Sequence, residues 1–109
     1  MGSQINDYHI SSDSDFIRIA HQSISQEVVL WKDIESILIK SIDSGQTEIE
    51  LWIHVTTQQT TVRFPVLADG FEGFLKNVSA LSGFDFKNFT EAMSSTENAT
   101  FALWTNTED

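Results

Sequence analysis

Four side chains that could do chemistry occupy alternate positions within residues 47–57, and they are Glu48, Glu50, Trp52 and His54. Alternate residues of a β-strand project from the same face, so these four side chains are expected to lie together. A histidine beside carboxylates could act as a general base, and a tryptophan beside charged groups could anchor a partner. On a chain this acidic, an ordinary strand surface explains the group better than catalysis does. We therefore treat these four residues as a candidate binding surface.

The remaining chemistry-bearing residues do not form a recognisable catalytic or metal-binding pattern. His9, His21 and His54 are far apart in the sequence, and none occurs in an HxH or HExxH spacing. The chain has no cysteine, which excludes a thiolate nucleophile and a cysteine metal site. It also lacks the GxSxG, GxGxxG and P-loop motifs. The sequence thus predicts a protein that is not an enzyme, with no catalytic residues, no metal and no cofactor.

The charge balance limits the classes of partner. Sixteen acidic residues against six basic ones give a net charge of -10, and the basic residues are scattered along the chain. Nucleic acids and anionic membranes are bound through basic patches that replace counterions, so we expect neither as a partner. Another protein, basic in character, would be attracted to this surface.

The expected location is the cytoplasm. No apolar run approaches the roughly 18 residues that a membrane span needs. The first residues have neither the basic region nor the apolar region of a signal peptide, and the absence of cysteine fits a reducing compartment.

The first two thirds of the chain has the alternating pattern of β-strands. The clearest case is residues 47–57, where Ile49, Leu51, Ile53 and Val55 would face inward. The longest apolar concentration, residues 28–43, reads as two strands joined by a short turn at 32–35, because its isoleucines favour strand over helix. Further strands are predicted at 16–21 and 60–66, and Pro65 should end the latter or place it at a sheet edge.

The pattern then changes to a helical spacing. Residues 69–82 predict an amphipathic helix, with Asp69 and Glu72 as a capping pair and Gly83 as the stop. Asp85 predicts the N-cap of a second, shorter helix, with Phe84 positioned to contact Phe89. Residues 99–105 read as a terminal strand.

These elements predict an α+β fold: an antiparallel, curved sheet followed by two helices and a C-terminal strand. Residues 16–105 would form a single domain, since the chain of 109 residues is long enough for one domain and too short for two. Residues 1–15 are polar and read as a flexible N-terminal arm, and residues 106–109 as a tail.

A fold-level resemblance comes from an L-W-x-D-I-x-x-I signature followed by an amphipathic helix. Its residues are Leu30, Trp31, Asp33, Ile34 and Ile37. This pattern resembles the small bacterial pleckstrin-homology-like domains over residues 16–82. The resemblance implies a half-barrel sheet that serves as a binding scaffold. It does not imply lipid binding, because the segment QSISQ between the first two strands is uncharged, where lipid-binding members have a basic loop.

The function predicted from the sequence is a non-enzymatic protein-interaction module of unknown specificity. Its acidic surface with the Trp52 face, or the exposed edge of its sheet, would contact another protein. Two alternatives stay open: a small-ligand-binding domain that uses the mouth of the curved sheet, and an immunity-type inhibitor of a basic toxin. A homodimer formed by pairing of edge strands is also compatible with the sequence.

Overall fold

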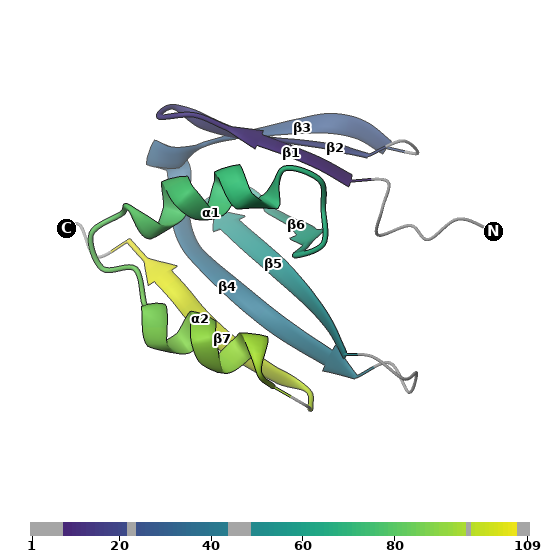
Figure 1. Cartoon of the computed structure of the whole chain (residues 1–109). Coiled ribbons are helices and arrows are strands. Elements are labelled where there is room, and N and C mark those ends of the chain that lie inside the picture. The colour runs from purple at the N-terminus through teal and green to yellow at the C-terminus, as the bar shows by residue number, and fades with distance from the viewer. Residues whose placement is uncertain (1–7, 22–23, 44–48, 96, 107–109) are drawn as a thin grey trace.

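The computed structural model describes residues 8–21, 24–43, 49–95 and 97–106 (Figure 1). These residues form seven strands, two α-helices and a short 3-10 turn. The strands are β1 (Tyr8–Ser12), β2 (Phe16–His21), β3 (Ile24–Leu30), β4 (Ile34–Asp43), β5 (Ile49–Thr57), β6 (Thr61–Pro65) and β7 (Ala99–Thr105). The helices are α1 (Phe71–Ser79) and α2 (Phe86–Met93), and the 3-10 turn η2 is Trp31–Asp33.

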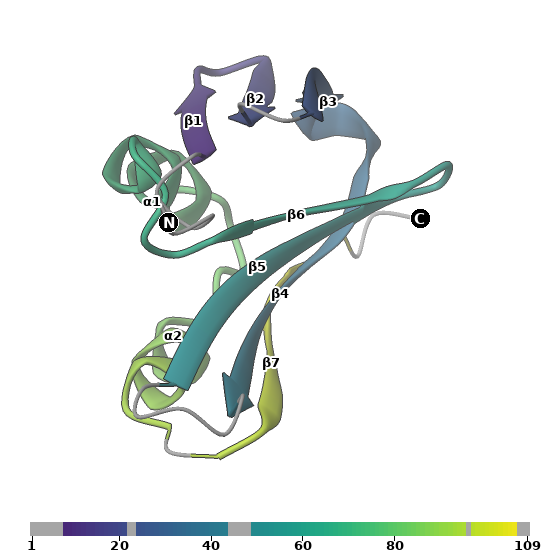
Figure 2. The same ribbon diagram turned by 90° about the vertical axis from the view of Figure 1, so that its right-hand side faces the viewer.

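The strands divide into two antiparallel sheets, and neither sheet curls or closes into a barrel. One sheet has the order β1-β2-β3 and the other the order β6-β5-β4-β7. The chain passes from the first sheet to the second at η2, and the two sheets face different directions (Figure 2). The predicted α+β class, with its two helices and C-terminal strand, is confirmed, whereas the strands belong to two sheets and not to one.

The apolar stretch of residues 28–43 consists of two strands joined by a short turn, as predicted. β3 ends at Leu30 and β4 begins at Ile34. β4 pairs with β5 on one side and β7 on the other, so it lies in the interior of the four-stranded sheet. Its side chains Ile37 and Ile39 are 0% exposed, which places this strand at the centre of the core.

Part of the segment assigned to the N-terminal arm is an ordered strand. Residues 8–12 form β1, which pairs with β2 so that Ile10 lies opposite Ile19. The Ile10 N–H donates to the Asp69 carbonyl at 2.7 Å, and the Asp69 N–H donates to the Tyr8 carbonyl at 3.0 Å. Burial of Ile10 and these long-range bonds stabilise the strand, and a polar sequence with few apolar residues does not reveal them. Residues 1–7 lie outside the described residues.

Both helices pack on the same side of the four-stranded sheet (Figures 1 and 2). On α1, Phe74 and Val78 are 0% exposed, and on α2, Ala92 is 0% exposed. The core is a single cluster to which both sheets and both helices contribute. No helix of the described residues is long and apolar enough to cross a membrane.

The two helix starts differ from one another. The predicted capping pair of Asp69 and Glu72 is wrong, because the N-cap of α1 is Gly70, with φ 90° and no side-chain hydrogen bond. The Asp69 carboxylate instead lies 3.1 Å from His9 Nδ1. The prediction for α2 is confirmed, since the Asp85 carboxylate accepts a hydrogen bond from the Asn88 N–H at 2.8 Å. A side-chain acceptor at this position satisfies one of the free N–H groups of the first turn.

α1 ends at Ser79, three residues before the predicted end, and the chain then turns toward α2. Gly83 lies in this turn with φ 94°, a conformation that favours glycine. The Phe84 and Phe89 rings then approach to 6.3 Å between centroids, in agreement with the predicted contact.

Candidate functional site

The structure places three of the four candidate residues on one face of β5. Glu50, Trp52 and His54 alternate along this strand, and Glu48 lies outside the described residues. The cross-strand register adds neighbours to the same face. Lys40 of β4 lies opposite Trp52, and Arg63 of β6 lies opposite His54. Lys40 and Arg63 were not singled out by the sequence analysis, although the alternation within residues 60–66 could have indicated Arg63.

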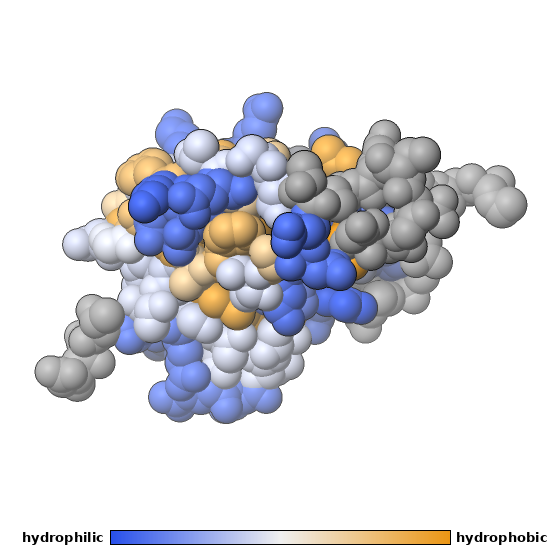
Figure 3. Space-filling view, turned by 90° about the horizontal axis from the view of Figure 1, so that it is seen from below, coloured by the Kyte–Doolittle hydropathy of each residue, from blue (hydrophilic) through white to orange (hydrophobic). Residues whose placement is uncertain are grey.

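This face is opposite to the one that the helices cover. Phe64 lies opposite Ile53 in the register and contacts Phe74 of α1, so these residues face the helices. Glu50, Trp52 and His54 therefore point to the other side, which we call the outer face. The outer face includes Ser36, Leu38, Lys40 and Ile42 of β4, Glu50, Trp52, His54 and Thr56 of β5, Thr61, Arg63 and Pro65 of β6, and Thr100 and Ala102 of β7. The lower end of the molecule, where α2 and β7 lie in Figure 1, has an apolar region bordered by hydrophilic side chains (Figure 3).

Trp52 is held in place by its neighbours and is only partly accessible. Its Nε1–H donates to Glu50 Oε1 at 3.1 Å. The Arg63 guanidinium lies 5.4 Å from the centroid of the Trp52 ring, a cation–π geometry. The Tyr8 ring meets Trp52 edge-on at 5.8 Å and also lies 4.4 Å from the His21 ring. The sequence did not indicate Tyr8 as a neighbour, because it was assigned to the arm.

His54 has an unusual environment for a polar side chain. Its Nε2 atom is buried and has no hydrogen-bond partner among the described residues. Burial, followed by the positive charges of Lys40 and Arg63, lowers the pKa of His54 below its ordinary value. The imidazole is therefore neutral at about pH 7. No carboxylate of the described residues is hydrogen-bonded to it, so the arrangement lacks the orienting partner of a general base.

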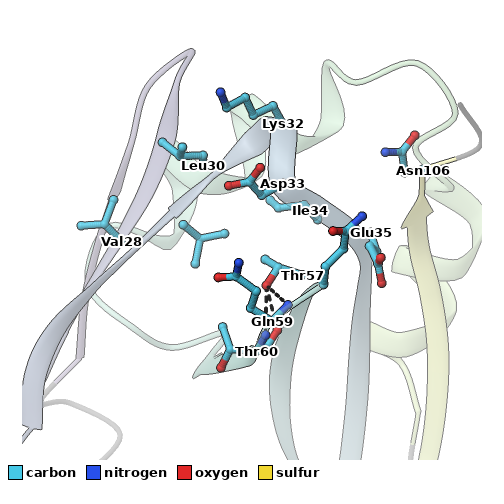
Figure 4. Close-up of a pocket in the computed structure, with 12 residues that line it drawn as sticks. Val28, Leu30, Lys32, Asp33, Ile34, Glu35, Thr57, Gln59, Thr60 and Asn106 are labelled. Carbon is cyan, nitrogen blue, oxygen red and sulfur yellow. Dashed lines mark hydrogen bonds between the residues drawn. The ribbon is translucent and has the colours of Figure 1, made fainter.

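A second surface feature, a groove of about 360 Å³, lies between the end of β3 and the turn that joins β5 to β6 (Figure 4). Its lining comprises Val28, Val29, Leu30, Lys32, Asp33, Ile34, Glu35, Thr57, Gln58, Gln59, Thr60 and Asn106. Hydrogen bonds hold this turn in place, because Thr57 Oγ1 accepts from the N–H groups of Gln59 and Thr60 at 3.2 Å and 3.1 Å. The same hydroxyl donates to the Thr60 carbonyl at 3.2 Å.

The opposite wall of the groove is an edge strand. β3 is the outermost strand of its sheet, and among the described residues its pairing partner is β2. Two apolar side chains of this strand are accessible, since Val28 is 50% exposed and Leu30 is 38% exposed. An edge strand presents a row of unpaired N–H and C=O groups, which can pair with another extended chain. The sequence analysis anticipated an exposed sheet edge but not the groove, because β3 and the β5–β6 turn are distant in the sequence.

Comparisons of this chain with protein-family models, with curated proteins and with solved structures found no match. No grouping of three or more potential metal-ligating side chains occurs among residues 8–21, 24–43, 49–95 and 97–106. The outer face and the groove are thus the two surfaces from which a function can be argued.

Proposed function

We propose that this chain is a non-enzymatic protein-interaction module, which binds an extended segment of a partner protein along the free edge of β3. The observation that carries this proposal is the position of the groove directly beside that edge. Val28 and Leu30 are accessible on the same strand. Backbone pairing and apolar contact are therefore both offered at one place.

The recognition mode is the addition of a strand to a sheet. Main-chain hydrogen bonds to the edge supply affinity that does not depend on sequence, and pockets for alternate side chains supply specificity. The apolar residues of the groove lining are Val28, Val29, Leu30 and Ile34, and the turn from Thr57 to Thr60 lines the other side. A segment seated there would be enclosed by β3 and by the β5–β6 turn.

The charges near the groove favour a basic partner. Asp33 and Glu35 line the groove, Glu27 lies on β3, and all three are exposed. Lys32 is the one cationic side chain in the lining. The net charge of -10 would also steer a basic protein toward this chain and accelerate association at low salt. An inhibitor of a basic toxin is one form that such a module could take.

The resemblance to pleckstrin-homology-like domains enters this proposal only as an analogy for a binding scaffold. The analogy is compatible with a groove beside an edge strand. It supplies no residue and no ligand to the proposed site.

The test is a selection of binders from a library of displayed random peptides, followed by mapping with NMR. We expect the selected peptides to alternate apolar and basic residues. They should shift the backbone amide signals of residues 26–30 and 57–60. Leu30→Lys should weaken binding at least about tenfold, because a lysine on an edge strand opposes pairing. Leu67→Lys is the matched control, since Leu67 is 71% exposed and lies outside the groove lining.

A double charge variant tests whether the acidic residues of the groove attract a basic partner. Asp33→Gln with Glu35→Gln should slow the association of a basic peptide. The control pair Glu91→Gln with Glu97→Gln removes the same charge from exposed positions outside the groove. Peptides that bind equally well to Leu30→Lys, or that shift the signals of Trp52 and not those of β3, would refute the groove as the binding site. A library that yields no binder would refute the interaction module in this form.

A further inference from the structure

The backbone groups of β3 alternate between β2 and the free edge. The Trp31 N–H donates to the Asp15 carbonyl at 3.0 Å, across the end of the β2–β3 pair. Residues of an antiparallel pair point their N–H and C=O groups toward the partner strand at every second position. The groups of Val29 therefore also point toward β2, whereas those of Val28 and Leu30 point away from it, to the free edge.

The other edge strands of the two sheets are partly occupied or blocked. In β1, the outward Ile10 N–H donates to the Asp69 carbonyl at 2.7 Å. In β7, the Leu103 carbonyl accepts a hydrogen bond from the Asp85 N–H at 2.8 Å. β6 ends at Pro65, which has no N–H to donate. The outward groups of β3 make no hydrogen bond to any described residue, so this edge is the best suited to an added strand.

The two faces of β3 carry different charges. Val29 lies opposite Ile17, which is 0% exposed, so its face points toward the core. Glu27 shares this face two positions earlier and is exposed. Val28 lies on the other face, opposite Arg18. A strand added at the free edge would thus have a carboxylate beside its core side and a guanidinium on its solvent side.

We propose that the partner segment adds to β3 in the antiparallel direction, with an apolar side chain opposite Val29 and a basic side chain opposite Glu27. This inference rests on the function proposed above and specifies the direction, the register and the chemistry of the partner. Antiparallel pairing is the more stable kind per residue, and every strand pair of the described residues is antiparallel.

The charges decide which side of the segment is basic. Opposite charges directly across an antiparallel pair stabilise it, and like charges destabilise it. A lysine or arginine opposite Glu27 would meet an exposed carboxylate. A basic residue opposite Val28 would instead lie on the face of Arg18, one strand further away, and would be repelled. Lys32 lies in η2, beyond the other end of β3 from Glu27, so it does not oppose this arrangement.

The direction fixes the order of residues along the segment. An antiparallel segment runs opposite to β3, so its residue opposite Val29 comes two positions before its residue opposite Glu27. The motif from N- to C-terminus is therefore apolar-x-basic, in which x lies opposite Val28. Parallel addition would need basic-x-apolar to make the same contacts. The order of two side chains in a peptide thus reports the direction of the added strand.

The experiment compares two blocked pentapeptides of identical composition by NMR titration of the full chain. One is acetyl-Thr-Val-Thr-Lys-Thr-amide, and the other is its reverse, acetyl-Thr-Lys-Thr-Val-Thr-amide. We expect the first to bind at least about fivefold more tightly. At saturation it should slow amide hydrogen exchange at Val28 and Leu30 at least about threefold and leave Val29 unchanged, because the Val29 N–H already points toward β2.

Two pairs of variants test the register. N-methylation of the central threonine removes the N–H that would bond to Val28 and should weaken binding at least about tenfold. N-methylation of the lysine changes an N–H that points away from β3 and should change binding less than about twofold. Glu27→Gln should weaken binding of the first peptide about threefold at low salt. Glu91→Gln, an exposed change on α2, is the control and should have no effect.

The outcomes separate this inference from the function on which it rests. Equal binding of the two pentapeptides, preference for the reverse peptide, binding of neither, or a greater loss on N-methylation of the lysine would each overturn the antiparallel register. The peptide library decides the interaction module separately. Library peptides that shift the signals of β3 without the apolar-x-basic order would overturn this inference and leave the interaction module standing.

Discussion

The Phe74 ring of α1 meets the Phe64 ring of β6 edge-on, with 5.1 Å between the ring centroids and an interplanar angle of 86°. Both side chains are 0% exposed. Phe74 also stacks on Trp31 of η2, with 6.1 Å between centroids. One side chain of the helix therefore contacts both the four-stranded sheet and the turn through which the chain enters it.

Phe74→Ala should lower the free energy of unfolding by about 3 to 5 kcal/mol, because it removes buried apolar contact and leaves a cavity. Phe86→Ala is the matched control. Phe86 is 62% exposed on α2, and its loss should cost less than about 1 kcal/mol. Urea unfolding followed by circular dichroism measures both. An equal loss of unfolding free energy in the two variants would mean that the core is not centred on Phe74.

Gly70→Ala should destabilise the protein by more than about 2 kcal/mol. Gly70 has φ 90°, and a Cβ atom there would clash with the carbonyl oxygen of Ile10 in β1. Gly73→Ala changes the same residue type three positions later, where a Cβ atom meets no atom within 4 Å. Alanine within a helix should stabilise α1 there by about 0.5 to 1 kcal/mol. Thermal unfolding of the two variants should therefore shift in opposite directions.

Asp85→Ala should lower the free energy of unfolding by about 1 kcal/mol, because the Asn88 N–H loses its acceptor at the first turn of α2. Glu91→Ala serves as the control, since it removes an equal charge from an exposed position near the end of the same helix. Chemical denaturation measures the difference. Asp85→Asn should retain most of the stability, because asparagine is also a good N-cap; loss of stability in that variant as well would point to the charge and not to the cap.

The stability of the protein should rise with pH in the range below the ordinary pKa of histidine. The pKa of His54 is lower in the folded chain than in the unfolded chain, because of burial and then of Lys40 and Arg63. The unfolded chain thus binds the proton first as pH falls, and stability is lost between about pH 6.5 and the lower folded pKa. Urea midpoints measured across this range should show a smaller slope for His54→Gln than for the natural chain. Lys40→Gln should raise the pKa of His54 in the folded chain and so narrow the pH range over which stability is lost. An unchanged dependence of the urea midpoint on pH in both variants would contradict the role of His54.

Much of the fold could be predicted because local spacing carries the information. The alternation of Ile53 and Val55 with Trp52 and His54 correctly separated a buried from a partly accessible face. Asp85 was correctly predicted as an N-cap because its acceptor role depends on a residue three positions away. The same rule gave a wrong prediction for Asp69. Whether a carboxylate caps a helix also depends on its other possible contacts, and the Asp69 carboxylate contacts His9 of β1.

The candidate site could be predicted only in part. The sequence by itself determined that Glu50, Trp52 and His54 share one strand face, because that follows from the two-residue period of the backbone. Only the tertiary structure decided that Tyr8 and Arg63 enclose Trp52, and that a groove forms beside β3. Those neighbours come from strands that are distant in the chain, and their meeting depends on strand pairing and sheet packing, which no local spacing encodes.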